Sequence, residues 1–251
     1  LFERITPKFA LNFKITPKIA VYTSFGLGFD TPANNELDNY PSSSNGGTTT
    51  INPDLEAQKS TNFEFGIKGS TQGIDKKYFT NTFAEVTFFH SIIEDEIVPF
   101  VYDNAYFYRN AGKTRRYGIE AGFNTDIVRG LSLKAAYTFS MFKYLEYQAL
   151  IIKPSPFQEI TEDYSDNTVP SVPQDLLSGE LGYSTGFAKY YSAFVKGNFR
   201  YVGSMFVNDK NVDSLKTADY ILLGAQLGFA VNYKGLNVTA YAGVDNIGDK
   251  K

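Results

Sequence analysis

The sequence predicts an all-β protein, an antiparallel transmembrane β-barrel, and three observations support this fold class. Apolar and polar residues alternate with a period of two along most of the chain, as in strands with one apolar face. Many alternating segments approach the roughly 9–11 residues with which a tilted strand crosses a bilayer, whereas ordinary strands have about 5–6. Short connections alternate with long ones, as at the two rims of an outer-membrane barrel.

The alternation begins in the first two segments, 5–14 and 18–30. In the second segment, apolar side chains occupy one face, and small or polar ones occupy the other. The apolar face carries Ile19, Val21, Phe25, Leu27 and Phe29, with Thr23 among them. The other face carries Ala20, Tyr22, Ser24, Gly26 and Gly28. Both segments are therefore predicted strands.

Later segments repeat the pattern, and the whole chain contains about ten of them. They include residues 118–124, 131–140, 221–229 and 236–241. The 22 Phe and 18 Tyr residues fit this arrangement, because aromatic rings suit lipid-facing positions and the two interfaces. The positions expected to face lipid include Phe9, Phe25, Phe123, Tyr137 and Phe229.

The connections differ in length and composition. The short ones contain residues 16–18, 73–75, 126–130, 186–189 and 232–235. The long ones are expected at 30–60, 93–106, 143–176 and 203–218. Unstructured loops of about thirty residues are uncommon in compact soluble domains, so the pattern favours a barrel over a soluble sandwich. If the odd-numbered connections are the short turns, both chain ends lie on the long-loop rim. The chain is then expected to be an interior piece of a larger barrel, with at least one strand missing at each end.

Composition excludes several function classes. With no cysteine, the chain has no disulfide scaffold, thiolate metal site or cysteine nucleophile. A net charge of −3 gives no basic surplus for nucleic acid. The lone His90 lacks a second ligand and is expected to be an interface or lumen residue. The acidic groups Glu94 to Glu96 and Glu159 to Asp166 lack the spacing of a calcium loop. No enzyme activity, resident metal or cofactor is expected.

Four segments resemble motifs of the TonB-dependent outer-membrane receptors. Phe25 to Pro32 is similar to the family's S-x-G-F-R-x-P strand end, and Asn52 to Thr61 is similar to its NPxLxPExS segment. Asn110 to Glu120 resembles the N-x-G pattern that precedes a G-x-E, and Asp245 to Lys251 resembles the segment before the final strand. Asp30 replaces a frequent Arg and Gly248 replaces a usual Phe.

This resemblance implies a barrel of about 22 strands, a plug domain inside it and a segment that contacts TonB. Residues 1–251 would form the C-terminal part of that barrel domain, without the plug and the final strand. The tail after Gly203 resembles the ferric-citrate type of siderophore receptor.

Two groups of residues are candidates for contact with a substrate. Tyr102, Tyr106, Tyr108 and Arg109 combine aromatic rings with a cation in an expected extracellular loop, which suits anionic or aromatic chelates. The alternative for these tyrosines is an aromatic girdle at the headgroup level. The expected lumen-lining residues are Arg116, Glu120, Glu180, Lys196 and Arg200, which would contact the plug, line the transport path or be solvated there.

The resemblance implies a bacterial outer-membrane receptor that actively transports a scarce metal chelate, such as a ferric siderophore, with energy delivered through TonB. Its expected partners are outer-membrane lipid, the TonB complex through the plug, and the chelate. Two alternatives remain open at this stage. One is a passive porin-like channel, and the other is a soluble all-β binding domain.

Overall fold

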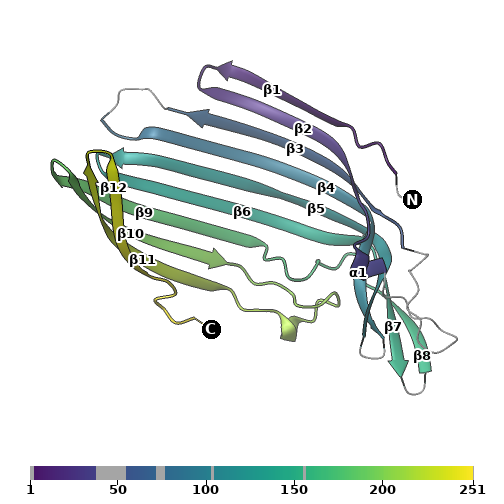
Figure 1. The fold of residues 1–251 in the computed structure, drawn as a ribbon. Coiled ribbons are helices and arrows are strands. Elements are labelled where there is room, and N and C mark those ends of the chain that lie inside the picture. The colour runs from purple at the N-terminus through teal and green to yellow at the C-terminus, as the bar shows by residue number, and fades with distance from the viewer. Residues whose placement is uncertain (1–2, 38–54, 72–76, 103–104, 155–156, 251) are drawn as a thin grey trace.

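The computed structural model describes residues 3–37, 55–71, 77–102, 105–154 and 157–250. Ten strands form one antiparallel sheet in the order β1-β2-β3-β4-β5-β6-β9-β10-β11-β12, which curls as Figure 1 shows. The strands of this sheet are β1 (Lys8–Thr16), β2 (Ile19–Asp30), β3 (Gln58–Ser70), β4 (Thr80–Tyr102), β5 (Ala105–Val128), β6 (Leu131–Glu146), β9 (Asp175–Ala188), β10 (Tyr191–Val202), β11 (Tyr220–Tyr233) and β12 (Leu236–Val244). The antiparallel β-sheet and its strand number were therefore predicted correctly.

Three smaller elements lie in the connections. The hairpin of β7 (Gln148–Pro154) and β8 (Phe157–Asp163) forms a separate two-stranded sheet. A short helix, α1 (Asn34–Leu37), follows β2, and a 3-10 turn, Asp213–Leu215, precedes β11. Among the described residues, no helix has the length and apolar content to cross a membrane.

The strand register separates an apolar face from a polar face. One row of paired residues crosses nine strands on the apolar face, from Phe13 through Val21, Ile67, Val86, Ala121, Tyr137, Leu177 and Tyr201 to Ile221. The next row lies on the polar face and includes Lys68, Glu85, Ser178 and Arg200. Because paired residues share a face and successive residues alternate, the predicted period of two is confirmed.

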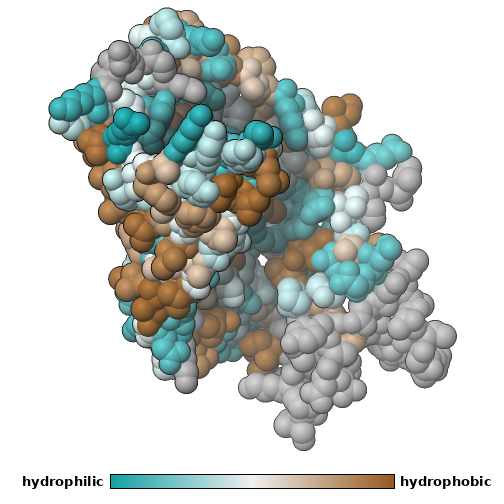
Figure 2. Space-filling view, turned by 60° about the vertical axis from the view of Figure 1, so that its left-hand side comes forward, coloured by the Kyte–Doolittle hydropathy of each residue, from teal (hydrophilic) through white to brown (hydrophobic). Residues whose placement is uncertain are grey.

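The five aromatic residues expected to face lipid all lie on the apolar face, and each is exposed. Figure 2, turned toward the short-turn end, shows apolar residues gathered along the outer side of the sheet. No second large sheet covers this face among the described residues, and the few buried apolar residues do not form a central core. A soluble sandwich requires two sheets packed about 10 Å apart, so this arrangement disfavours that alternative.

The predicted long loop at 93–106 is wrong, because β4 and β5 remain paired as far as Tyr102 and Ala105. These strands have 23 and 24 residues, well beyond the expected crossing length. The predicted loop at 143–176 also contains the end of β6 and the hairpin β7–β8. The charged residues of both regions suggest loops. However, a ladder outside a membrane satisfies its backbone hydrogen bonds whether or not its side chains are charged.

The connections lie at two ends of the sheet. Short connections join β1 to β2, β5 to β6, β9 to β10 and β11 to β12, all at the left in Figure 1. The β3–β4 connection at the same end spans residues 71–79, of which 72–76 lie outside the described residues. The long connections and the extended β4–β5 hairpin lie at the opposite end. We call these the short-turn end and the long-loop end.

Candidate functional site

The five residues predicted to line a lumen share the polar face of the sheet. Glu120 pairs with Thr138, and Arg116 pairs with Phe142 on the same strand pair. The register then continues through β9 to Glu180, Lys196 and Arg200 without a change of face. These residues therefore lie on one wall, although on different strands and at different heights.

One part of this wall is an acidic hollow of about 760 Å³ between β2 and β6. Glu64, Glu85 and Glu120 line it, and no cationic side chain is among its lining residues. The Tyr22 hydroxyl donates to Glu85 Oε1 at 2.6 Å and lies 2.5 Å from the Thr87 hydroxyl. Tyr22 reaches β4 by crossing Gly66 of β3, where a Cβ would lie 2.4 Å from the phenol ring.

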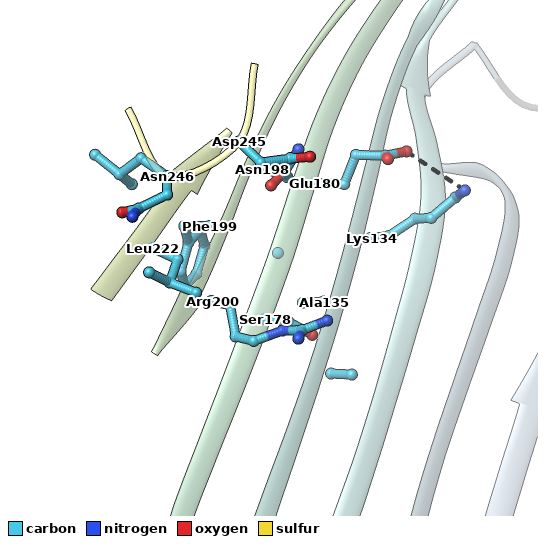
Figure 3. A pocket seen from close by; sticks show the side chains of 13 residues that line it. Lys134, Ala135, Ser178, Glu180, Asn198, Phe199, Arg200, Leu222, Asp245 and Asn246 are labelled. Carbon is cyan, nitrogen blue, oxygen red and sulfur yellow. Dashed lines mark ion pairs between the residues drawn. The ribbon is translucent and has the colours of Figure 1, made fainter. Parts of the chain in front are cut away.

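A second hollow, of about 560 Å³, lies between β6 and the segment after β12 (Figure 3). Glu180 accepts ion pairs from Lys134 at 3.4 Å and from Lys196 at 3.6 Å. Arg200 and Asp245 also line this hollow. Cations and carboxylates are therefore mixed here, whereas the first hollow is acidic. A wall with both regions can hydrogen-bond a polar domain or a hydrated solute.

Arg116 lies nearer the long-loop end and is held by other residues of the chain. Its guanidinium forms an ion pair with Glu96, and it lies 5.4 Å from the centre of the Phe142 ring. Glu96 also accepts a hydrogen bond from the hydroxyl of Thr114, which is 1% exposed. Arg116 therefore lies on the polar face with its charge already paired.

The candidate contact residues of the β4–β5 hairpin fall into two groups. The side chains of Tyr102 and Tyr106 lie outside the described residues. Tyr108 and Arg109 are half-buried, and Arg109 donates to the Gln148 carbonyl of β7 at 2.5 Å. This contact fastens the two hairpins to each other, so Arg109 has a structural partner.

A cluster of three tyrosines at the long-loop end was missed in the sequence. The rings of Tyr144 and Tyr147 lie 4.5 Å apart, and Tyr164 packs edge-on against Tyr147 at 5.7 Å. Tyr144 donates to Asp209 at 2.6 Å, and Tyr164 donates to Glu162 at 2.8 Å. No period or spacing in the sequence links these residues, because Tyr144 lies at the end of β6, Tyr147 lies just after it and Tyr164 lies after the β7–β8 hairpin.

The surroundings of this cluster favour neutral phenols. Burial and the hydrogen bond to Asp209 raise the pKa of Tyr144 above its ordinary value. Burial and the Glu162 carboxylate raise the pKa of Tyr164 to about 12. Glu162 also pairs with Lys210 at 2.6 Å. The tyrosine cluster therefore ties β6, the β8–β9 connection and the β10–β11 connection into one unit.

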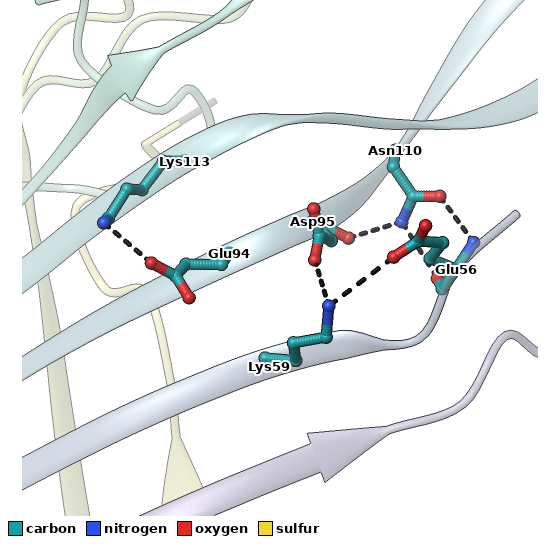
Figure 4. Close-up of polar contacts among 6 residues, drawn as sticks. All are labelled: Glu56, Lys59, Glu94, Asp95, Asn110 and Lys113. Carbon is teal, nitrogen blue, oxygen red and sulfur yellow. Dashed lines mark hydrogen bonds and ion pairs between the residues drawn. The ribbon is translucent and has the colours of Figure 1, made fainter. Parts of the chain in front are cut away.

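The N-x-G segment has a structural role at the same end (Figure 4). Asn110 Oδ1 accepts from the Glu56 amide at 2.6 Å, and its Nδ2 donates to the Glu56 carbonyl at 2.9 Å and the Asp95 carbonyl at 2.6 Å. Lys59 pairs with Asp95 at 2.7 Å. These contacts fasten the segment before β3 to the β4–β5 hairpin.

The glycine of the following G-x-E also has a structural reason. A Cβ on Gly118 would lie 2.0 Å from the Phe139 carbonyl oxygen and 2.6 Å from the Phe89 ring. Only glycine allows this close approach, whereas Gly122, four residues later on the same face, has no atom within 4 Å of a built Cβ.

The lone histidine lies on the apolar face of the sheet. His90 pairs there with Phe63 and Tyr117, and it also borders the hollow between β2 and β6. Within the described ranges, no group of three His, Asp or Glu side chains gathers closely enough to hold a metal ion.

Comparison with known proteins identifies the same family over nearly the whole chain. The family model "TonB dependent receptor-like, beta-barrel" matches residues 2–247. An uncharacterized TonB-dependent receptor of Haemophilus influenzae is 24% identical over 243 residues, which are 92% of this chain and 61% of the relative. The chain therefore spans about three fifths of the curated relative that it matches.

Solved structures share the fold. The ferric preacinetobactin receptor BauA of Acinetobacter baumannii superposes with a TM-score of 0.64 at 20% identity, over 98% of this chain and 32% of BauA. The ferric yersiniabactin uptake receptor FyuA of Yersinia pestis gives a TM-score of 0.65 at 19% identity, over 97% of this chain and 32% of FyuA. At these identities the similarity is one of fold.

Proposed function

Since the chain belongs to the TonB-dependent receptor-like β-barrel family, whose model matches residues 2–247, we propose that it forms barrel wall in a bacterial outer-membrane receptor. The receptor takes up a ferric siderophore or a similar metal chelate, and TonB supplies the energy. The observation that carries the proposal is this family match, together with a sheet that has one apolar and one charged face. The uptake receptors BauA and FyuA share the fold, which supports a ferric chelate as the substrate class.

In this proposal, the apolar face contacts lipid and the polar face lines a wet lumen. Arg116, Glu120, Glu180, Lys196 and Arg200 belong to the lumen wall. The ion pairs of Glu180 with Lys134 and Lys196 keep charged groups fixed on that wall. Charges of both signs allow the wall to hydrogen-bond a plug and later to be solvated when the plug moves.

Residues 1–251 account for part of the barrel. β1 and β12 form the two edges of the described sheet, and each has one neighbouring strand. Edge strands are not stable in hydrocarbon, because their backbone groups have no hydrogen-bond partners there. Further strands of the same receptor therefore close the barrel, and a plug domain that TonB contacts fills it.

Substrate is captured at the long-loop end. The tyrosine cluster and the contact of Arg109 with β7 hold the hairpins and connections in place. The proposed contact residues are Tyr102, Tyr106, Tyr108 and Arg109, which make the sequence of the β4–β5 hairpin Tyr-rich and cationic. Phenol and guanidinium groups recognise aromatic or anionic chelates by stacking and by charge-assisted hydrogen bonds.

Uptake by cells tests the proposal. A strain that lacks the receptor gene is complemented with the full-length gene, and radio-iron uptake is measured for a panel of ferric siderophores. At least one chelate should be taken up, and that uptake should disappear in a strain without TonB. Uptake that persists without TonB would support a passive channel instead. No uptake of any metal chelate would refute the transport proposal.

A further inference from the structure

The short connections carry a surplus of positive charge. The five connections at the short-turn end contain the cations Lys18, Lys76, Lys77, Arg129, Lys189 and Lys234. Asp75 is the single carboxylate in their sequence. Each of the five connections therefore supplies at least one Lys or Arg.

The long connections have the opposite balance. The segments between β2 and β3, β4 and β5, β8 and β9, and β10 and β11 contain far more carboxylates than cations. The carboxylates are Glu36, Asp38, Asp54, Glu56, Asp103, Asp166, Asp209, Asp213 and Asp219, and the cations are Lys210 and Lys216. The two ends of the sheet thus differ in sign, although the whole chain is nearly neutral.

Four described cations at the short-turn end are exposed to solvent. Lys77, Arg129, Lys189 and Lys234 are exposed, and none of them forms an ion pair with a described carboxylate. The neighbouring Asp126 accepts a hydrogen bond from Asn81 at 2.8 Å. Their charge is therefore not neutralised by the described part of the chain.

Aromatic rings accompany these cations. Lys189 lies 5.2 Å from the centre of the Tyr190 ring, and Lys234 lies 5.4 Å from that of Tyr233. The two tyrosine rings meet edge to face at 4.9 Å. Beside them, Phe187, Tyr191 and Phe229 stack at 5.8–6.2 Å and are exposed on the apolar side. Amphipathic aromatic side chains of this kind mark the level of lipid headgroups.

We propose that the short-turn end is a basic collar, formed by Lys77, Arg129, Lys189 and Lys234, that binds the phosphate groups of anionic phospholipids. The membrane placement in this inference depends on the proposed function, which puts the short turns at the periplasmic, phospholipid-containing leaflet. Lysine and arginine near an anionic leaflet are each attracted to its surface, and their contributions add along a rim. The acidic long-loop end excludes the same lipids.

The position of the collar favours a lipid partner over an acidic soluble protein. The cations follow successive turns along the rim of the curved sheet and do not form one compact patch. The aromatic triad of Phe187, Tyr191 and Phe229 faces the same side as the lipid-facing row of the sheet. A headgroup therefore meets a cation and an aromatic ring together, while its acyl chains meet the apolar face.

Native mass spectrometry of the full-length receptor tests the collar. The purified receptor is titrated with phosphatidylglycerol, which is anionic, and with phosphatidylcholine, which is zwitterionic. Phosphatidylglycerol should bind more tightly, and the preference should weaken as salt rises. The triple variant R129Q/K189Q/K234Q should lower the affinity for phosphatidylglycerol by about 100-fold, because each cation near an anionic surface contributes roughly fivefold and the three factors multiply.

Two variants serve as matched controls. K113Q/K143Q/K216Q removes three cations from the long-loop end and should leave the lipid preference unchanged, while K189R/K234R keeps the charge and should retain it. Equal affinity for both lipids, or equal loss in R129Q/K189Q/K234Q and the long-loop control, would overturn the collar. If no chelate is transported but the lipid preference persists, the transport proposal fails and the collar stands.

Discussion

Two asparagine side chains at the long-loop end each form hydrogen bonds with both the amide and the carbonyl of one residue in another segment. Removal of either asparagine should release only the segment that it holds. Asn110 forms such a pair of bonds with Glu56 and a third bond with the Asp95 carbonyl. Asn211 does the same for Thr168, with distances of 2.6 Å to its amide and 2.8 Å to its carbonyl. Asn110→Ala should therefore release the segment before β3 and leave the β8–β9 connection in place.

The expected size of the effect follows from the three bonds. A neutral hydrogen bond contributes about 0.5–1.5 kcal/mol net, so the loss of three would cost about 1.5–4.5 kcal/mol. Leu55 and Ala57 are buried and continue to hold the segment in place. We therefore expect a free-energy cost in the lower half of this range, about 2 kcal/mol. Local opening should then become about 30-fold more frequent, since about 1.4 kcal/mol is a factor of ten.

Hydrogen–deuterium exchange of the full-length receptor measures this change. In Asn110→Ala, peptides that cover residues 55–60 should exchange about 30-fold faster, while peptides over 164–170 should match the wild type. The reciprocal control is Asn211→Gly, with glycine chosen because Asn211 has a φ of 53°, and it should affect only the second peptide. Unchanged exchange at 55–60, or equal acceleration of both peptides by either variant, would refute the reasoning.

Three further predictions address packing, charge and titration. Gly118→Ala should lower the free energy of unfolding in urea by about 1–3 kcal/mol, because the new Cβ meets a carbonyl oxygen. The control Gly122→Ala should leave this free energy unchanged. Equal shifts in both variants would contradict the packing argument. Glu96→Ala leaves the half-buried Arg116 guanidinium without its carboxylate and should cost about 2 kcal/mol, and the double variant with Arg116→Ala should cost less than the sum of the single ones. Since the pKa of Tyr164 is raised to about 12, the stability from its neutral phenol is complete below about pH 10 and is lost as pH rises toward 12. A tyrosinate absorbance titration should lose this late step in Tyr164→Phe, and identical curves would disprove the assignment.

The sheet could be predicted from the sequence because apolar and polar side chains alternate along its strands. On one face most residues are apolar or small, with exceptions such as His90 and Arg115, and the period of two fixes the face of residues such as Glu120 and Arg200. The ends of the β4–β5 hairpin could not be predicted in this way. Outside a membrane the ladder no longer needs an apolar face, so Glu94, Asp95 and Glu96 look like a loop although they belong to a strand.

The contacts of the long-loop end could be predicted even less. Tyr144 lies at the end of β6, Tyr164 in the β8–β9 connection and Asp209 in the β10–β11 connection, and only the folded chain brings them together. The N-x-G segment is recognisable in the sequence as a family pattern, but the structural role of its asparagine follows only from the folded geometry. Asn110 supplies a donor and an acceptor to a backbone 54 residues away, and no local rule of sequence identifies that partner.

Net charge is a poor guide to the partners of a barrel, because the topology sorts charges by connection. The value of −3 hides a basic end and an acidic end. Only the alternation of short and long connections assigns each Lys and Asp to one of these ends. The acidic long-loop end repels an approaching polyanion, and salt screens this repulsion. We therefore expect a solute of low or positive charge to approach this end faster than a polyanion does.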